Sequence, residues 1–546
     1  MIRRDFGSQW AVAACAAYFS TVLNISFWRF VLSRLDFSKA GTAVFAMSMP
    51  IVLFLVFYAA FSLLVWPCVA KPLMAVLLVI SSAACYFMFK LNVIIDSEMI
   101  RNVFEARPHE VFEMVTVGGV LWVAFLGVVP ATAFFFIRIR YRAIHRELLG
   151  RIVYVAGSLF LLIVLAFVFF KDYAAAGRNN KMAGKFLNPF NYITSTLSYL
   201  RKQARRDLPF VVIDETPEHV PYEDPCLTVV VLVIGETARA MNFSLNGYGR
   251  ETNPKLSGQD IVNFPRVMAS GTATAFSLPC MFSPLGRKDF DIDLSYRSEN
   301  LLDIVQKAGY DVVWLDNQGS SKGVADRVTT VDLMNEGNNK FRNGDTFFDE
   351  VLLDGLEGRI ANLKKDTVIV LHMMGSHGPS YYRRYPNEFR VFTPTCDTAE
   401  IQNYPREEIV NAYDNTILYT DHVVSGVIDI LKRFPQHEAG MIFISDHGES
   451  LGENGLYLHG IPYSIAPIEQ IHVPMVLWMS ETMRREDYVD YEGLKNGAGE
   501  MELSHDHFFH SILGLVEIDT ELYDPALDLF GKFRSKDLPN GRGVKR

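Results

Sequence analysis

Five long apolar segments fill most of the first 170 residues of this 546-residue chain, and none of them contains a charged residue. They are residues 10–28, 43–66, 72–89, 114–137 and 152–170. At about 1.5 Å of rise per residue, each is long enough to cross a hydrocarbon core of roughly 30 Å as a helix. No small-residue cleavage pattern ends the first segment, which indicates a retained span rather than a signal peptide. The sequence therefore predicts a membrane domain of five helices, residues 1–170.

Arginines indicate how these helices are oriented. Positively charged residues in short loops stay on the cytoplasmic side of a membrane. Such residues precede the first segment and crowd the loop between the fourth and fifth: Arg3, Arg4, Arg138, Arg140, Arg142, Arg146 and Arg151. Five spans then place everything after Lys171 on the opposite side. We expect a multi-pass protein of a bacterial inner membrane with its polar part in the periplasm, although an outward-facing domain of a Gram-positive organism fits the same charges.

The composition supports this division. Half of the residues are hydrophobic, which is high for a wholly soluble protein, whereas 21% charged residues require a substantial water-exposed part. The net charge of −9 gives no reason to expect binding to nucleic acid. Only Cys226, Cys280 and Cys396 fall in the polar part, so no cysteine framework holds it together.

Residues 171–225 are expected to link the membrane domain to a soluble domain, residues 226–546. Residues 192–203 have helical character, and a basic cluster beside them suits either a solvated linker helix or contact with anionic lipid headgroups. This cluster is Arg201, Lys202, Arg205 and Arg206.

Apolar runs alternate with amphipathic segments throughout the soluble domain. The predicted strands are residues 228–234, 312–315, 367–372, 441–445 and 473–478, and the predicted helices include residues 301–308, 350–363 and 412–434. Alternation of this kind predicts an α/β domain with a central, mostly parallel sheet covered on both faces. In such sheets, ligands bind at the carboxyl ends of the strands.

Metal-ligating residue types follow three of the predicted strands. Glu236 follows residues 228–234, His377 follows residues 367–372, and Asp446 and His447 follow residues 441–445. Carboxylate oxygens combined with an imidazole nitrogen suit zinc, and a catalytic zinc keeps one position open for substrate. A single strand-end Glu or His is more often structural, but three such ends together predict a metal site.

A nucleophile is expected in the segment of small residues from Ser270 to Cys280. Small residues before a helix let the backbone approach a phosphate, and the helix N-terminus supplies N–H donors. A Thr hydroxyl in this turn becomes a nucleophile when a metal lowers its pKa. The alternative interpretation is that the Thr only caps the helix.

These residues belong to a series of motifs that resembles the membrane phosphoethanolamine transferases that modify lipid A, including the colistin-resistance enzymes. The resemblance runs in the order of the family across the soluble domain, and the five-span anchor matches as well. The motifs are Gly235-Glu236-Thr237-Ala238-Arg239, Asn246-Gly247-Tyr248, Thr252-Asn253-Pro254, Gly271-Thr272-Ala273-Thr274, Pro279-Cys280-Met281-Phe282-Ser283, Gly375-Ser376-His377-Gly378-Pro379, Tyr413-Asp414-Asn415 and Ser445-Asp446-His447-Gly448-Glu449-Ser450-Leu451-Gly452-Glu453.

The resemblance implies an alkaline phosphatase/sulfatase-like head and assigns a role to each matching residue. It implies that Thr274 is both a zinc ligand and the nucleophile, and that His377 and His459 bind substrate or a second zinc and assist the leaving group. It implies phosphate contact for Lys322, with Gln318 nearby. The implied ligands of the catalytic zinc are Glu236, Thr274, Asp446 and His447.

The implied reaction is a double displacement. Phosphoethanolamine passes from phosphatidylethanolamine to Thr274 and then to a phosphate of lipid A, which confers resistance to cationic peptides and polymyxin. We expect a monomeric enzyme. The acceptor remains open, because transfer to the lipopolysaccharide core, to a glycan or to a protein uses the same donor chemistry. A phosphoglycerol transferase and a catalytically idle lipid sensor are the alternatives outside this reaction, and Thr274 does not fit a sulfatase.

The sequence departs from the family at its cysteines. The resemblance implies a disulfide between the residue before Gly-Thr and the Cys of Pro-Cys-Met. In this sequence the first of these two positions is Ser270, so Cys280 lacks its cysteine partner. A second family pair corresponds to Ser321 and Ala325, and Cys396 has no Cys about eight residues later. We therefore expect the family's periplasmic disulfides to be absent.

Two further histidine features are predicted to be structural. The segment from His505 to His510 contains three histidines and is expected to start a helix that packs near the site, with a metal role as the alternative. His372 lies inside an apolar run and is expected to be a core residue.

Overall fold

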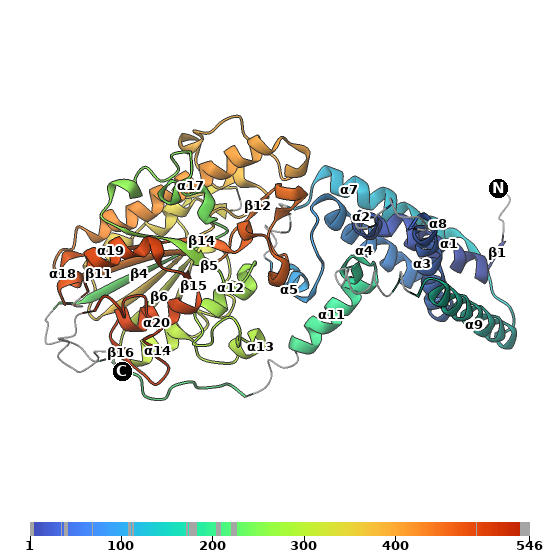
Figure 1. Cartoon of the computed structure of the whole chain (residues 1–546), viewed down its shortest axis with the longest axis horizontal. Helices are drawn as coiled ribbons and strands as arrows, with labels where there is room; N and C mark the ends of the chain where they lie inside the picture. Colours follow the sequence, from blue (N-terminus) through green and yellow to red (C-terminus); the bar gives the residue numbers. More distant parts are fainter. Residues whose placement is uncertain are drawn as a thin grey trace. The chain divides into compact units, whose positions relative to one another are not determined.

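The computed structural model describes residues 5–33, 35, 37, 42–67, 69–106, 111, 114–170, 173, 183–203, 209–219, 226–344, 346–486 and 489–534 (Figure 1). Arg3, Arg4, Arg205 and Arg206, on which parts of the topology and linker predictions rest, lie outside these residues. The chain forms two compact units, residues 1–104 with 115–199 and residues 105–114 with 200–546.

The first unit contains five helices that are long and apolar enough to cross a membrane, which confirms the prediction of five such helices. They are Ser8–Leu32 (α1, Ser8–Thr21; a 3-10 turn; α2, Ile25–Leu32), α3 (Thr42–Leu64), α4 (Ala70–Lys90), Val117–Phe136 (α7, Val117–Val123; a π-helical segment; α8, Val129–Phe136) and α9 (Ile144–Val168). The described residues also include two shorter helices, α5 (Ser97–Glu105) and α11 (Phe190–Gln203).

The fifth span begins earlier than predicted. Arg146 and Arg151 were expected in the loop before it, but both lie in the first turns of α9. The helix accommodates Arg151 because Glu147, one turn earlier, forms a buried ion pair with it at 3.1 Å. Close by in this unit, the short strand β1 (Asp5–Gly7) pairs in parallel with β2 (Arg138–Arg140).

The second unit is built on an eight-stranded sheet with the order β15-β5-β14-β11-β4-β10-β6-β7. Seven of these strands run in one direction and β14 alone runs against them, so the predicted mostly parallel sheet is confirmed. The strands are β4 (Thr228–Gly235), β5 (Val262–Met268), β6 (Asp311–Asp316), β7 (Thr329–Asp332), β10 (Thr367–His372), β11 (Glu438–Ser445), β14 (His472–Met479) and β15 (Leu503–Ser504).

Both faces of the sheet are covered by helices, which explains why β4, β10 and β11 are continuous apolar runs with almost every residue buried. Figure 1 shows α17 along one face and α14 and α20 along the other. The helices of this unit are α12 (Thr274–Met281), α13 (Ile292–Ser295), α14 (Leu301–Lys307), α15 (Leu333–Glu336), α16 (Leu356–Ala361), α17 (Arg406–Leu431), α18 (Glu481–Glu486), α19 (Tyr491–Gly497) and α20 (Asp506–Leu515).

One predicted helix is wrong in its continuity. Residues 350–363 were expected to form one helix, but a 3-10 turn (Asp349–Leu352) is separated from α16 by Gly355. Gly355 has φ of +75°, a left-handed conformation that ends one helix and begins another at little cost for glycine.

Candidate active site

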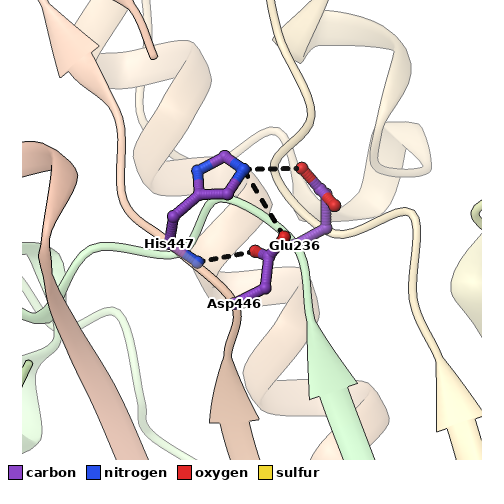
Figure 2. Close-up of side chains that lie close together, drawn as sticks. All are labelled: Glu236, Asp446 and His447. Carbon is purple, nitrogen blue, oxygen red and sulfur yellow. Dashed lines mark hydrogen bonds and ion pairs between the residues drawn. The ribbon is translucent and has the colours of Figure 1, made fainter. Parts of the chain in front are cut away.

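The register between the two central strands brings two carboxylates together. Ser445 at the end of β11 pairs with Gly235 at the end of β4, so Asp446 and Glu236 leave the sheet as neighbours. The backbone N–H of Asp446 donates to the carbonyl of Gly235 at 3.0 Å, which extends this pairing by one step. His447 follows directly, and potential ligand atoms of Glu236, Asp446 and His447 all lie within 4.8 Å of one another (Figure 2).

Three electron-pair donors converge at this point. The Nε2 atom of His447 lies 3.5 Å from Oε1 of Glu236 and 3.4 Å from Oδ2 of Asp446. Its Nδ1 atom lies 2.9 Å from the carbonyl of Gly448, which can only accept, so Nδ1 carries the proton and Nε2 presents its lone pair. Within the described part of the chain, Oε1 of Glu236 and Oδ2 of Asp446 are buried without any hydrogen-bond partner.

The electrostatics of this cluster favour a cation. Burial, reinforced by the charge of Asp446, raises the pKa of Glu236 well above its usual value. Burial lowers the pKa of His447 to about 4, so its imidazole is neutral at physiological pH. Buried carboxylate oxygens without donors are costly, and a bound cation would satisfy them together with the Nε2 lone pair. The residues therefore fit a divalent metal ion.

The hydroxyl of the first residue of α12 faces this cluster. Oγ1 of Thr274 donates to Oε2 of Glu236 at 3.0 Å and lies 3.3 Å from Nε2 of His447. Thr274 is the first residue of α12, whose N-cap is Ala273, so its side chain does not cap the helix. The hydroxyl of Thr272 points elsewhere and donates to the carbonyl of Ile461 at 2.8 Å.

Two more histidines continue the site as a row of imidazoles. The ring centroid of His459 lies 4.4 Å from that of His447 and 6.1 Å from that of His377. Burial disfavours the charged form of His459, but the carboxylate of Glu449, 3.3 Å from Nδ1, outweighs this and raises the pKa of His459. Burial, followed by the charge of Arg384, lowers the pKa of His377 well below its usual value.

The loop after β6 carries Gln318 and Lys322. Asp316 accepts the backbone N–H groups of Gln318 and Gly319, both at 3.1 Å, which shapes the loop. The charge of Lys322 partly opposes the rise in the pKa of Glu236 and adds to the lowering of the pKa of His377, so the ammonium group is close to the site. Lys322 is only 9% exposed and has φ of +51°. It is therefore not the solvated loop charge that its sequence context would suggest.

Two carboxylates that support the site had no role in the sequence prediction. Glu449 holds His459, and Asp349 accepts the N–H groups of Met374 (2.8 Å) and Gly375 (2.9 Å), which fixes the turn before His377. Glu449 stands in a recognised motif, which was an available signal. No sequence signal indicated the role of Asp349, because the N–H groups that it binds follow β10, a distant strand in the sequence.

The features predicted to be structural are found in the interior of the head. His372 is fully buried, with Nδ1 3.0 Å from Asp316, and is a core residue as predicted. His505 immediately precedes α20 and packs behind the site. Cys280 and Cys396 are buried free thiols, and the Ser321 hydroxyl accepts the N–H of Ala325 at 3.2 Å, at the two positions that correspond to the family's second cysteine pair.

Comparisons with known proteins agree with this geometry. Residues 53–204 match the family described as Phosphoethanolamine transferase EptA/EptB, and residues 228–518 match the Sulfatase family. The chain is 42% identical to Phosphoethanolamine transferase EptA of Salmonella typhimurium over 519 residues, which covers 94% of each protein. It belongs to the phosphoethanolamine transferase family.

Two further relatives of these phosphoethanolamine transferases extend the comparison. Phosphatidylethanolamine transferase Mcr-1 of Escherichia coli is 32% identical and covers 95% of this chain and 96% of its own length. The solved integral membrane protein lipooligosaccharide phosphoethanolamine transferase A from Neisseria meningitidis superposes with a TM-score of 0.95 at 39% identity, covering 97% of this chain and all of that one. The predicted family membership, the enzyme class and the fold are thereby confirmed.

Proposed function

We propose that this protein transfers phosphoethanolamine from phosphatidylethanolamine to a phosphate of lipid A, using zinc and a covalent intermediate on Thr274. The observation that carries the proposal is the convergence of the Thr274 hydroxyl with two partnerless carboxylate oxygens and an imidazole lone pair. The names of relatives support the substrates: one is a phosphatidylethanolamine transferase, and another is a Kdo(2)-lipid A phosphoethanolamine 7''-transferase that matches 46% of this chain.

Glu236, Asp446 and His447, together with Thr274, would hold the zinc ion. When bound, zinc supplies Lewis acidity that favours ionisation of the Thr hydroxyl and neutralises phosphoryl charge. An oxygen and imidazole donor set of this kind is typical of catalytic zinc. At high zinc concentration, His377 and His459 would bind a second ion, with the Nδ1 atom of His459 still engaged by Glu449.

In the first step, Oγ1 of Thr274 forms a bond to phosphorus and the bond to the diacylglycerol oxygen breaks. Oε2 of Glu236 already accepts the Thr274 hydrogen bond and is placed to take its proton. His459, whose pKa is raised by Glu449, returns a proton to the diacylglycerol oxygen. Lys322 stabilises the negative oxygens of the phosphoryl group, and Gln318 and His377 hold it by hydrogen bonds.

In the second step, an oxygen of a lipid A hydrogen phosphate attacks the phosphorus of the phospho-Thr274 intermediate and gives its proton to His459, which restores the proton lost in the first step. The bond between phosphorus and Oγ1 breaks, and Thr274 recovers its proton from Glu236. The product carries an added ethanolammonium group, which reduces the negative charge of lipid A and weakens the attraction of cationic peptides such as polymyxin.

The enzyme acts as a monomer in the bacterial inner membrane, with its catalytic unit in the periplasm. The arginines between α8 and α9 support this orientation. Reporter fusions should be cytoplasmic at residue 145 and periplasmic at residue 200 and at the C-terminus. A cytoplasmic C-terminus would contradict the proposed access to outward-facing lipids.

Trapping of the intermediate tests the proposed reaction. Incubation with phosphatidylethanolamine and no acceptor should add one phosphoethanolamine to Thr274, detected by peptide mass spectrometry. Thr274→Ala should abolish both adduct and transfer, whereas Thr274→Ser should keep part of each. Thr272→Ala is the matched control, since it removes a hydroxyl from the same turn that faces away from the cluster. An adduct on another residue would overturn the nucleophile assignment.

Mass spectrometry of lipid A from cells with and without the protein tests the acceptor. A phosphoethanolamine adduct on a lipid A phosphate is expected. An adduct found only on core sugars, a glycan or a protein would reject lipid A as the acceptor while leaving the donor chemistry intact.

A further inference from the structure

A histidine outside the catalytic set reaches the segments that carry the site. His505 lies between β15 and α20 and is almost completely buried. Its backbone N–H donates to the carbonyl of Met268 at 3.0 Å, which continues the parallel pairing of β15 with β5. The edge strand therefore delivers this imidazole to the carboxyl end of the sheet.

Both ring nitrogens of His505 bond to residues next to the site. Nε2 lies 3.0 Å from the carbonyl of Ser445, so it carries the proton and donates. Nδ1 accepts the backbone N–H of Ser270 at 3.2 Å and lies 3.3 Å from the hydroxyl oxygen of Ser277. A neutral imidazole supplies one donor and one acceptor, and both are used here.

These partners belong to the two chain segments that carry the candidate active site. Ser445 immediately precedes the proposed ligands Asp446 and His447, whereas Ser270 and Ser277 flank Thr274 in sequence. The Ser277 hydroxyl also donates to the carbonyl of Asp446. The His505 imidazole therefore links the segment that carries Thr274 to the segment that carries Asp446 and His447, in addition to the direct bond from Ser277.

We propose that His505 is a positioning residue that fixes Thr274 relative to Asp446 and His447. This role rests on the proposed function of Thr274. Displacement of a reacting group by about 1 Å can reduce the rate roughly 100-fold, so loss of the bridge should lower kcat without weakening the binding of donor lipid.

Substitutions at His505 in the full-length protein test the kinetic effect. His505→Ala should lower kcat about 10–100-fold while the KM for phosphatidylethanolamine stays within about twofold. In His505→Asn and His505→Gln, kcat should fall less than in His505→Ala. The amide of Asn can replace the hydrogen bond made by Nδ1, and that of Gln the one made by Nε2. His507→Ala is the matched control: its imidazole belongs to the same turn, but Nδ1 lies against Ser504, three residues earlier.

A disulfide offers a rescue that a general folding role would not permit. Burial raises the pKa of the Cys280 thiol to about 12, and the Ser270 side chain opposes that rise, so the two side chains are close to each other. Ser270→Cys should therefore form a disulfide with Cys280 and tie the turn before Thr274 to the body of α12. In the His505→Ala background this bond should restore kcat at least tenfold, and reductant should remove the gain from the same sample. Intact mass shows whether the disulfide has formed.

Hydrogen exchange separates this proposal from the proposed function. In metal-free protein, peptides covering residues 270–277 should exchange faster in His505→Ala than in wild type, while those from α17 should be unchanged. An unchanged kcat in His505→Ala, or unchanged exchange in residues 270–277, would overturn the positioning role. Failure of Thr274→Ala to abolish the adduct would overturn the nucleophile instead, whatever the exchange data show.

Discussion

Each of the two units buries a glutamate, and the two side chains are treated in opposite ways. In the membrane unit, Glu147 is saturated with donors: Ser8 at 2.6 Å, the N–H of Arg142 at 3.1 Å and two nitrogens of Arg151 at 3.1 and 3.2 Å. Arg151 in turn donates to two carbonyls and lies 4.4 Å from the ring of Trp66.

In the soluble unit, Glu236 receives one hydrogen bond from Thr274, and its other oxygen meets Asp446 and His447 without any donor among the described residues. A buried charge with all its hydrogen bonds made holds a fold together, whereas a buried charge with an unmet oxygen destabilises it until a ligand arrives. Buried carboxylate oxygens that lack hydrogen-bond donors therefore distinguish the site from a structural ion pair built of the same residue type.

The largest expected effect is a loss of activity when one of the two carboxylates without hydrogen-bond donors, Glu236 and Asp446, is removed. Asp446→Ala removes one ligand and should reduce transfer by at least about 1,000-fold, corresponding to roughly 4 kcal/mol of lost transition-state stabilisation. Zinc content of the purified protein should fall with it. Full activity of the wild-type enzyme after exhaustive chelation would contradict a metal-dependent site.

The stability of the metal-free protein should depend on pH, because ionising the buried Glu236 without a bound cation destabilises the fold. The raised pKa of Glu236 means that the folded state holds its proton more tightly than the unfolded state. Its stabilising contribution is present below the usual pKa near 4.5 and is lost as pH rises through the raised value. Metal-free wild type should therefore melt at a higher temperature on mild acidification through that window. Glu236→Gln should flatten this response and melt higher than metal-free wild type at neutral pH, measured by intrinsic fluorescence.

The saturated glutamate should behave in the opposite way. Glu147→Ala leaves the buried Arg151 without its carboxylate and should destabilise the membrane unit by about 3–5 kcal/mol, with or without zinc. Thermal unfolding in detergent measures this, and Glu481→Ala at the start of α18 provides a control substitution in the soluble unit. A Glu147→Ala protein as stable as wild type would show that hydrogen-bond saturation is a poor guide to structural roles.

The sequence predicted the site as far as its strands could be recognised as apolar runs. β4, β10 and β11 are buried on both faces and appear as continuous apolar runs, so the acids and histidines at their ends could be placed at one edge of the sheet. β5 contains Asn263, Pro265 and Arg266, and β7 and β15 are short edge strands, so none of the three was predicted.

Contacts between residues of different strands could not be predicted from the sequence, for a different reason. The choice of Thr274 over Thr272 depends on how one turn leaves β5, and periodicity does not encode that. The resemblance to a family supplied it. The bridge from His505 to Ser445 joins residues 60 positions apart and follows from the pairing of an edge strand, which no local pattern indicated.

A smaller effect is expected at Lys322, which adds charge to the site without touching the carboxylate cluster through any hydrogen bond found among the described residues. Lys322→Met keeps the length of the side chain and should lower kcat about 100-fold, the usual effect of removing one group that stabilises transition-state charge. Lys340→Met, on an exposed 3-10 turn, is the control. A wild-type kcat in Lys322→Met would limit the site to the metal cluster and the histidines.

The smallest effect is expected from reductant, and it sharpens the comparison because it asks whether covalent bonds contribute to holding the site. Removal of a native disulfide usually costs about 2–5 kcal/mol. Cys280 and Cys396 are buried free thiols. Where the family resemblance implied cysteine pairs, the Ser270 hydroxyl donates to the carbonyl of Ser277 and the Ser321 hydroxyl accepts the N–H of Ala325. Reductant should therefore leave both the melting temperature and the activity of the wild-type enzyme unchanged, whereas the oxidised Ser270→Cys protein should lose stability on reduction. A large loss in the wild type would mean that a disulfide forms in solution and that the site's rigidity is not achieved by hydrogen bonds such as those of His505.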